Sequence, residues 1–115
     1  MTSTLTSAER ARKTIEDNIF KHTQSLCDAL QRDFEKDSSS GYSFTIDPGK
    51  KYYKIIMNTG NQRSVHAFVD KKTGEVYKAA SWRGPAKHVR FDLRLIADRE
   101  YLFENADWAG GYLYM

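Results

Sequence analysis

The 115-residue sequence has little cysteine, little proline and no long apolar run. Its single cysteine, Cys27, excludes a disulfide within the chain and is typical of a reducing compartment. No apolar stretch approaches the roughly 20 residues that a membrane-spanning helix needs. The first ten residues also lack the basic start and apolar run of a secretory signal. We therefore expect a protein that has no membrane segment and acts in a cytosol.

Residue patterns for metal binding or covalent catalysis are also scarce. His22, His66 and His88 are isolated, without the paired Cys or His spacing of a metal site. Cys27 lies beside the apolar stripe of a helical segment, which is typical of a buried, inert thiol. No serine lies in a nucleophile-elbow motif, and no carboxylate pair falls on an expected strand. We predict no metal, no cofactor and no catalytic residue.

Positive charge is concentrated in the middle of the chain. Residues 50–90 contain ten Lys or Arg and two Asp or Glu, which gives a net charge of +8. Residues 1–49 carry −2 and residues 91–115 carry −3, so that the whole chain carries +3. This uneven distribution of charge favours residues 50–90 as the charged binding surface.

The first third of the chain predicts one long helix. Thr6 and Glu9 have the spacing of a capping box, in which each side chain accepts a backbone amide proton. The residues that recur at intervals of three and four, and so share one stripe, are Ala8, Ala11, Ile15, Ile19, His22, Leu26, Leu30 and Phe34. A continuous helix of this length spans about 42 Å. Either it lies across a sheet, or part of it projects and pairs with a second copy.

An antiparallel meander is predicted to follow the helix. Short runs rich in Tyr, Ile, Val and Phe occupy residues 42–46, 51–57, 63–69 and 75–79, and turn residues separate them. The run DKKTG ends at Gly74 and is typical of a type I turn that closes on a left-handed glycine. We therefore expect four antiparallel strands within residues 42–80.

Alternation assigns the side chains of these strands to two faces. We expect the helix to cover the face that carries Ile55, Met57, Val65 and Val69. The opposite face then holds Lys54 and His66. Lys78 shares a side with Val76, and a bulge at Gly74 would move it to the opposite face.

The rest of the chain, residues 81–115, is predicted to contain a loop, a short helix and an aromatic end. Gly84 and Pro85 interrupt the pattern, so residues 81–88 are interpreted as an irregular loop in which Pro85 opens a helical turn. Residues 89–94 alternate like a fifth strand, unless a helix already begins at Leu93. Residues 98–106 predict a short helix, and the aromatic C-terminus is expected to dock on the core or on a partner.

The fold class that follows is a single α+β domain. We expect a long N-terminal helix packed on a four- to five-stranded antiparallel meander, with a short C-terminal helix. The predicted parts are a flexible lead-in over residues 1–5, the helix over 6–36, the sheet over 42–80 and the remainder over 81–115.

Cations and aromatic rings alternate through residues 50–90. Such a sheet suits single-stranded nucleic acid, because phosphates meet the cations while bases stack on the rings. It also suits a smaller phosphorylated ligand, which Arg83 can grip in a fork. The candidate ligand-binding residues are Lys54, Arg63, His66, Tyr77, Lys78, Trp82, Arg83, Lys87, His88 and Arg90. The alternatives are turn lysines in water beside core rings, or a protein partner.

Two segments resemble small proteins of tailed bacteriophages that have no assigned function. They are SVHAFVDKKTGEVYKAASWRGPAKHVR at residues 64–90 and ADWAGGYLYM at residues 106–115, and the resemblance runs from about Lys51 to Met115. It implies a phage origin, action in the host cytoplasm and a host or phage binding partner. It brings no catalytic residues.

Together these observations predict a non-catalytic phage accessory protein. It would bind nucleic acid or a phosphate-bearing ligand through the basic sheet and the loop over residues 82–90. The alternative is a protein-interaction module or homodimer that acts on a host or phage protein.

Overall fold

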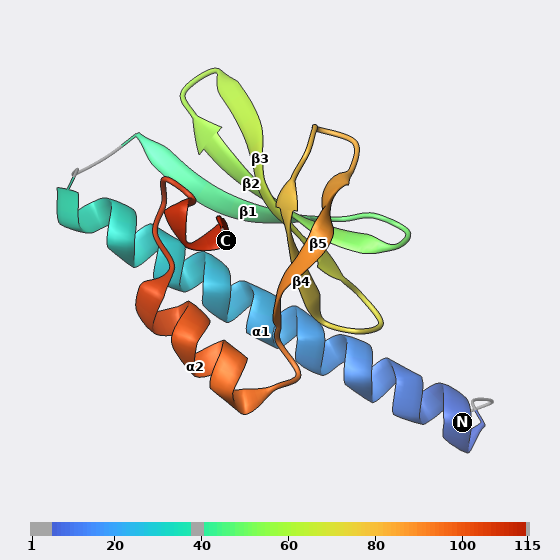
Figure 1. The fold of residues 1–115 in the computed structure, drawn as a ribbon. Helices are drawn as coiled ribbons and strands as arrows, with labels where there is room; N and C mark the ends of the chain where they lie inside the picture. Colours follow the sequence, from blue (N-terminus) through green and yellow to red (C-terminus); the bar gives the residue numbers. More distant parts are fainter. Residues whose placement is uncertain (1–5, 38–40, 115) are drawn as a thin grey trace.

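Two helices lie on one face of a five-stranded antiparallel sheet (Figure 1). The computed structural model describes residues 6–37 and 41–114, so the expected lead-in over residues 1–5 lies outside the described residues. The elements are α1 (Ser7–Asp37), β1 (Tyr42–Pro48), β2 (Tyr52–Thr59), β3 (Gln62–Asp70), β4 (Glu75–Ala79), β5 (Pro85–Asp92), α2 (Ile96–Asn105) and a 3-10 turn at Gly111–Leu113. Each strand pairs with the one before it. The predicted α+β class is confirmed.

Helix α1 agrees with its predicted bounds to within one residue. The Thr6 hydroxyl accepts a proton from Glu9 N at 3.1 Å, and Glu9 Oε1 accepts one from Thr6 N at 3.4 Å, which completes the capping box. Leu26 and Leu30 are fully buried against the sheet. Residues 6–8 and 10–14 are exposed, and Figure 1 shows the first turns of α1 extending past the strands. The apolar stripe predicted for this helix therefore packs against the rest of the protein only from about Ile15 onward.

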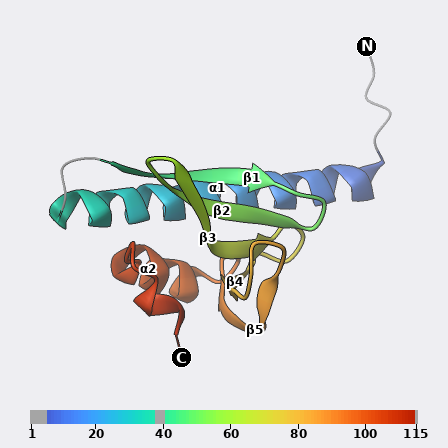
Figure 2. The same ribbon diagram turned by 90° about the horizontal axis from the view of Figure 1, so that it is seen from above.

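The C-terminal segment closes the core beside α2, as the aromatic residues predicted. Leu102 of α2 and Leu113 are fully buried. The Trp108 ring meets Phe34 edge-on with centroids 5.5 Å apart, and its backbone N–H donates to Asp33 Oδ2 at 3.0 Å. Figure 2 shows α2 beside α1, with the C-terminal segment next to α2. No helix in the described part of the chain is long and apolar enough to span a membrane.

The predicted irregular loop over residues 81–88 instead forms the tip of the β4–β5 hairpin and the first half of β5. The backbone N–H groups of Ala80 and Ser81 donate to Gly84 O at 3.1 and 3.2 Å, which closes the tip. Pro85 begins β5 and pairs with Ala79, so it opens no helical turn. Proline fits here because β5 is an edge strand and no neighbour needs its N–H. The fifth strand was therefore predicted correctly in type, but it begins four residues before Val89.

A β-bulge changes which side chains of β3 share a face. Ile55 pairs with Ala67 and Ile56 pairs with Val65, so His66 is the extra residue. The extra residue reverses the alternation beyond it. His66 therefore lies on the side of the helices and Val65 on the opposite side. The prediction that placed His66 beside Lys54, and Val65 under the helix, is wrong for this reason.

The predicted bulge at Gly74 is wrong as well. Residues 67–69 pair with residues 76–78 without a shift, so Lys78 stays on the same side as Val76. Gly74 instead closes the turn at φ 77°, where its N–H donates to Asp70 O at 2.9 Å. Lys78 is consequently on the helix side of the sheet. The predicted bulge would have moved it to the opposite face, beside Lys54.

The sheet thus has two unlike faces. The helix face carries Tyr53, Ile55, Ala67, Val69 and Val76, which belong to the main core with α1 and α2. The side chains of Lys54, Ile56, Phe68 and Tyr77 alternate to the other side of the sheet, which we call the outer face. Ile56 and Phe68 are buried there although no helix covers them.

Candidate functional site

Aromatic rings form a small cluster on the outer face. The rings of Tyr52 and Phe68 meet edge-on with centroids 5.6 Å apart. Tyr52 also meets Tyr77 edge-on, at 6.1 Å. These rings come from three neighbouring strands, because Tyr52, Phe68 and Tyr77 have the same side-chain parity across β2, β3 and β4. Phe68 forms the buried floor, and the two tyrosines stand partly exposed around it.

Cations cover these rings. Lys54 Nζ lies 4.4 Å from the centroid of the Trp82 ring and 5.8 Å from that of Phe68. Arg63 Cζ lies 5.6 Å from the Trp82 centroid. Trp82 sits at the tip of the β4–β5 hairpin with 44% of its surface exposed. The arrangement is a set of cation–π contacts on an open face, in which long side chains shelter apolar surface and keep their charges in water.

A pocket of about 210 Å³ opens beside this cluster, and we call it the outer pocket. Its lining residues are Asp47, Gly49, Lys50, Lys51, Tyr52, Lys54, Phe68 and Arg83. The β1–β2 turn fixes one wall, since Gly49 N–H donates to Tyr52 O at 2.9 Å and Lys71 Nζ donates to Gly49 O at 3.0 Å. Four cations therefore surround a ring-lined hollow that contains one carboxylate.

None of the four cations of the outer pocket forms an ion pair within residues 6–37 and 41–114, although the Asp47 carboxylate lines the same pocket. The ion pair found in that part of the chain joins Lys13 to Asp17 on α1, at 3.8 Å. Like charges held close together repel, and an anion placed among them relieves that repulsion. With four cations and one carboxylate in its lining, the outer pocket carries a net positive charge.

The structure brings together half of the residues predicted for the site. Lys54, Arg63, Trp82 and Arg83 lie in or beside the outer pocket, and Tyr77 joins them through its contact with Tyr52.

The other predicted residues lie elsewhere. His66 and Lys78 line a different pocket on the helix face. Arg90 Nε donates to Leu113 O at 2.6 Å, which uses that guanidinium to hold the C-terminal segment. Lys87 and His88 are exposed on β5 and line neither pocket.

Four further residues that supply cations or rings to the outer pocket were absent from the predicted set, namely Lys50, Lys51, Tyr52 and Phe68. Lys50 and Lys51 precede β2, and one of the alternatives treated them as turn residues in water. The signal that could have found Phe68 is its parity with Lys54, because the two residues pair directly across β2 and β3. The lysines could not be placed from periodicity, since they belong to a turn.

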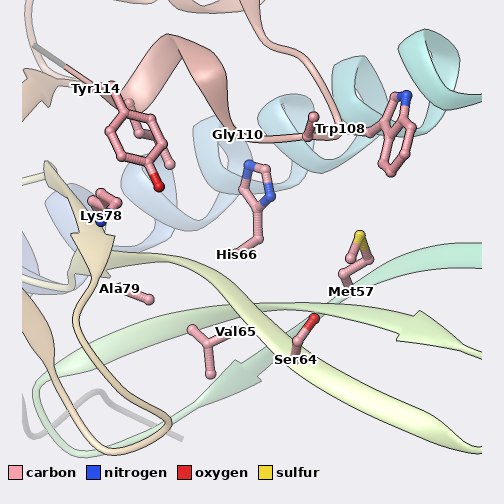
Figure 3. A pocket seen from close by; sticks show the side chains of 11 residues that line it. Met57, Ser64, Val65, His66, Lys78, Ala79, Trp108, Gly110 and Tyr114 are labelled. Atoms are coloured by element: carbon pink, nitrogen blue, oxygen red, sulfur yellow. The ribbon is translucent and has the colours of Figure 1, made fainter.

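The second pocket, which we call the inner pocket, lies between the β3 bulge and the C-terminal segment and has a volume of about 250 Å³. Its lining residues are Met57, Ser64, Val65, His66, Lys78, Ala79, Trp108, Ala109, Gly110, Leu113 and Tyr114. Figure 3 shows His66 at its centre, with Gly110, Trp108 and Tyr114 on one side and Ser64 and Val65 on the other. His66 Nε2 is hydrogen-bonded to the Tyr112 hydroxyl at 2.7 Å, and the two rings stack.

Burial controls the protonation of the groups around the inner pocket. Desolvation lowers the pKa of His66 from 6.5 to about 4, although the nearby Asp107 carboxylate acts in the opposite direction. Desolvation also raises the pKa of Tyr112 well above its usual value. Both rings are therefore neutral near pH 7, and their hydrogen bond joins two uncharged groups.

Cys27 lies buried in α1, in agreement with its predicted environment. Desolvation raises the pKa of its thiol to about 12, and Asp28 adds to that effect. The reactive thiolate is therefore scarce at neutral pH. Among the residues that the structure describes, no group of three His, Cys, Asp or Glu side chains is placed to hold a metal ion.

Comparison with known proteins adds a family but no activity. Residues 3–115 match the profile of a family of unknown function, DUF7717, and the chain belongs to this family. No curated protein and no solved structure matches the chain significantly. The function must therefore be inferred from the geometry of the outer face.

Proposed function

We propose that this member of the DUF7717 family is a non-catalytic accessory protein of a tailed bacteriophage that binds single-stranded nucleic acid on its outer face. The observation that carries the proposal is the outer pocket, where four cations that form no ion pair within the described chain lie beside aromatic rings. Phosphates neutralise such cations, and bases stack on exposed rings. Trp82 and Tyr52 are the rings with accessible surface closest to these cations.

A single strand fits the outer face better than a duplex. Both helices lie on the helix face, so neither is available on the outer face to enter a major groove. A sheet that presents rings from adjacent strands is instead suited to splayed bases. The partly exposed Tyr52 and Tyr77 are within 6.1 Å of each other and can receive neighbouring bases.

The phage origin and the host cytoplasm in this proposal are supported by the resemblance of residues 64–90 and 106–115 to small phage proteins. A non-catalytic role is supported by the same resemblance, which brings no catalytic residues.

The decisive experiment measures binding of a fluorescently labelled oligothymidine by anisotropy at several salt concentrations. Because binding releases counter-ions from the strand, affinity is expected to fall steeply between about 50 and 200 mM salt. Arg83→Ala together with Lys51→Ala removes two cations of the outer pocket. The double variant is expected to bind more weakly and to reduce the slope of log K against log salt by about 1.4, since each contact with a single strand contributes about 0.7.

Lys87→Ala is the matched control, because Lys87 is an exposed cation of the same segment that does not line the outer pocket. It should leave both affinity and slope nearly unchanged. Affinity that does not depend on salt, or an equal loss in Lys87→Ala, contradicts the proposal. Mononucleotide titration forms a second arm: tight binding of a nucleotide without binding of the oligomer assigns the outer pocket to a small phosphorylated ligand.

The competing function is a protein-interaction module, and the exposed start of α1 favours it. Ala8 and Ala11 lie on turns of α1 that extend past the sheet, where nothing in the described chain covers them. A pull-down from host lysate with and without nuclease separates the two functions. Recovered nucleic acid supports the proposal, whereas a partner protein that resists nuclease replaces it with the competing function.

A further inference from the structure

We infer that the inner pocket binds a small organic carboxylate with a planar apolar body. This site is independent of the proposed nucleic-acid surface, because the inner pocket opens on the helix side of β3 and β4 and shares no lining residue with the outer pocket. The inference rests on the shape, the charge and the fixed walls of the inner pocket.

The walls of the inner pocket combine polar groups with apolar and aromatic surface. Met57 and Leu113 supply aliphatic surface, and Trp108 and Tyr114 supply rings on the side of the C-terminal segment (Figure 3). The volume of about 250 Å³ equals the space of roughly eight water molecules at about 30 Å³ each. A compact molecule of similar size, with one flat face for the rings, suits these walls.

Charge selects a singly negative ligand. Lys78 is the one charged residue in the lining, and no carboxylate from the described chain lines the inner pocket. Its ammonium lies 4.5 Å from the centroid of the Tyr114 ring and forms no ion pair within residues 6–37 and 41–114. A partly buried ammonium gains most from a carboxylate, since a charge-assisted hydrogen bond offsets its lost hydration. A phosphate dianion would need a second cation.

Polar groups beside Lys78 can complete the recognition. The Nε2 of His66 is occupied by the Tyr112 hydroxyl, and no hydrogen bond joins the remaining ring nitrogen, Nδ1, to the described chain. When the tyrosine hydroxyl donates to Nε2, the neutral imidazole carries its proton on Nδ1 and can donate it to a ligand. The exposed Ser64 offers a further hydroxyl at the rim.

The inner pocket is formed before any ligand arrives. Its C-terminal wall is tied to the rest of the protein by three hydrogen bonds from distant residues, which involve Arg90, Asp33 and His66. Asp107 also accepts the backbone N–H groups of Gly111 and Tyr112, both at 3.1 Å. A wall that is already ordered avoids the entropic cost of closing around a ligand, so even a small molecule can bind measurably.

The test titrates benzoate into uniformly ¹⁵N-labelled protein and follows amide chemical shifts, with inorganic phosphate as a parallel titration. Benzoate is expected to cause saturable shifts centred on His66, Ala79 and Gly110 with a roughly millimolar Kd, which is ordinary for so small a ligand. Phosphate is expected to leave these amides unchanged. Shifts confined to the outer face, or no saturable shifts with benzoate, overturn the inference.

Two variants and one control locate the binding. Lys78→Met removes the ammonium and is expected to weaken benzoate about tenfold or more, while Lys87→Met removes an exposed cation from β5 and should change nothing. Met57→Trp places a larger side chain in the inner pocket and should abolish binding by exclusion, without any change in charge. Unchanged affinity in either Lys78→Met or Met57→Trp, each checked for an intact amide spectrum, contradicts the assigned site.

Discussion

The two faces of the sheet bury apolar residues in different ways. On the helix face, Ile55 is fully buried beneath α1 and joins a core that includes Leu26 and Leu30. On the outer face, the next residue, Ile56, is equally buried although no helix lies above it. Phe68 is also buried on this face, where the Tyr52 ring meets it edge-on and the Lys54 ammonium lies 5.8 Å from its centroid, so a ring and a long cationic side chain cover it in place of a helix.

This difference teaches how a small sheet can carry a charged surface and remain stable. The helix face gains its stability from close packing, which tolerates no polar group without a partner. The outer face leaves its ammonium and guanidinium groups in water, where they can meet a ligand. Four tests, from the largest expected effect to the smallest, examine whether the two faces are as distinct as the structure indicates.

The largest effect is expected from a cavity on the helix face. Leu30→Ala should lower the free energy of unfolding by about 2–5 kcal/mol, because Leu30 is fully buried in the core. Urea denaturation followed by circular dichroism measures the change. Leu95→Ala removes the same atoms from a residue that is 55% exposed, and it should change stability by less than about 0.5 kcal/mol. Similar losses in both variants contradict the assigned core.

The pH dependence of stability tests the placement of His66. Its pKa is about 4 in the folded protein and 6.5 when the side chain is fully solvated, so the unfolded chain takes up the proton first as pH falls. Its contribution to stability is complete above pH 6.5 and is lost toward pH 4, by up to about 3 kcal/mol. Burial lowers the pKa of His22 as well, which acts in the same direction.

Unfolding free energies measured from about pH 7 down to pH 4.5 should therefore depend less on pH in His66→Gln than in the wild type. His88→Gln changes an exposed histidine and should keep the wild-type dependence. An unchanged dependence in His66→Gln would place His66 in water on the outer face, as simple alternation predicted.

A smaller effect is expected on ligand binding at the outer face. Trp82→Ala should weaken oligothymidine by about 1–3 kcal/mol, the contribution of one base stacked on an aromatic ring. Fluorescence anisotropy at fixed salt measures it. Trp108→Phe changes the other tryptophan, which packs on the helix face near Phe34, and should leave oligonucleotide affinity unchanged. The reverse ranking of the two variants would move the binding surface to the helix face.

The smallest effect is expected from removing a cation above the outer rings. Lys54→Ala should cost about 0.5–1 kcal/mol of stability, since its ammonium lies over the Trp82 ring on a solvated surface. Urea denaturation measures this loss. Lys54→Arg keeps the charge and the stem and should be nearly neutral. A loss of several kcal/mol in Lys54→Ala would show that the outer face is packed like the helix face.

Most of the fold could be predicted from local patterns in the sequence. The capping box at Thr6 and the turn that ends at Gly74 are present as expected, and the 75–79 strand was predicted residue for residue. These signals depend on neighbours within a few residues, so they need no knowledge of the tertiary structure. The docking of the C-terminal rings also followed from their cost in water.

The candidate site could be predicted only in part, because two features depend on pairing between strands. A bulge at His66 moves that residue to the helix face, and nothing in the residues around it marks the extra position. Lys78 followed its alternation correctly, and the bulge invoked to move it was wrong. From the sequence, Pro85 is expected to interrupt regular structure because it has no N–H group. On an edge strand it can still pair with its one neighbouring strand.

The order of the strands along the chain has a consequence for how the protein is made. Every strand pairs with the one just synthesised, so the sheet can zip together hairpin by hairpin while the chain emerges from the ribosome. Residues 106–114, which complete the core with Ala106 and Leu113, are made only after every strand. A nascent or truncated chain that lacks them therefore leaves uncovered the part of the core that Ala106 and Leu113 close, so the helix side of the sheet is completed only when Leu113 has been added.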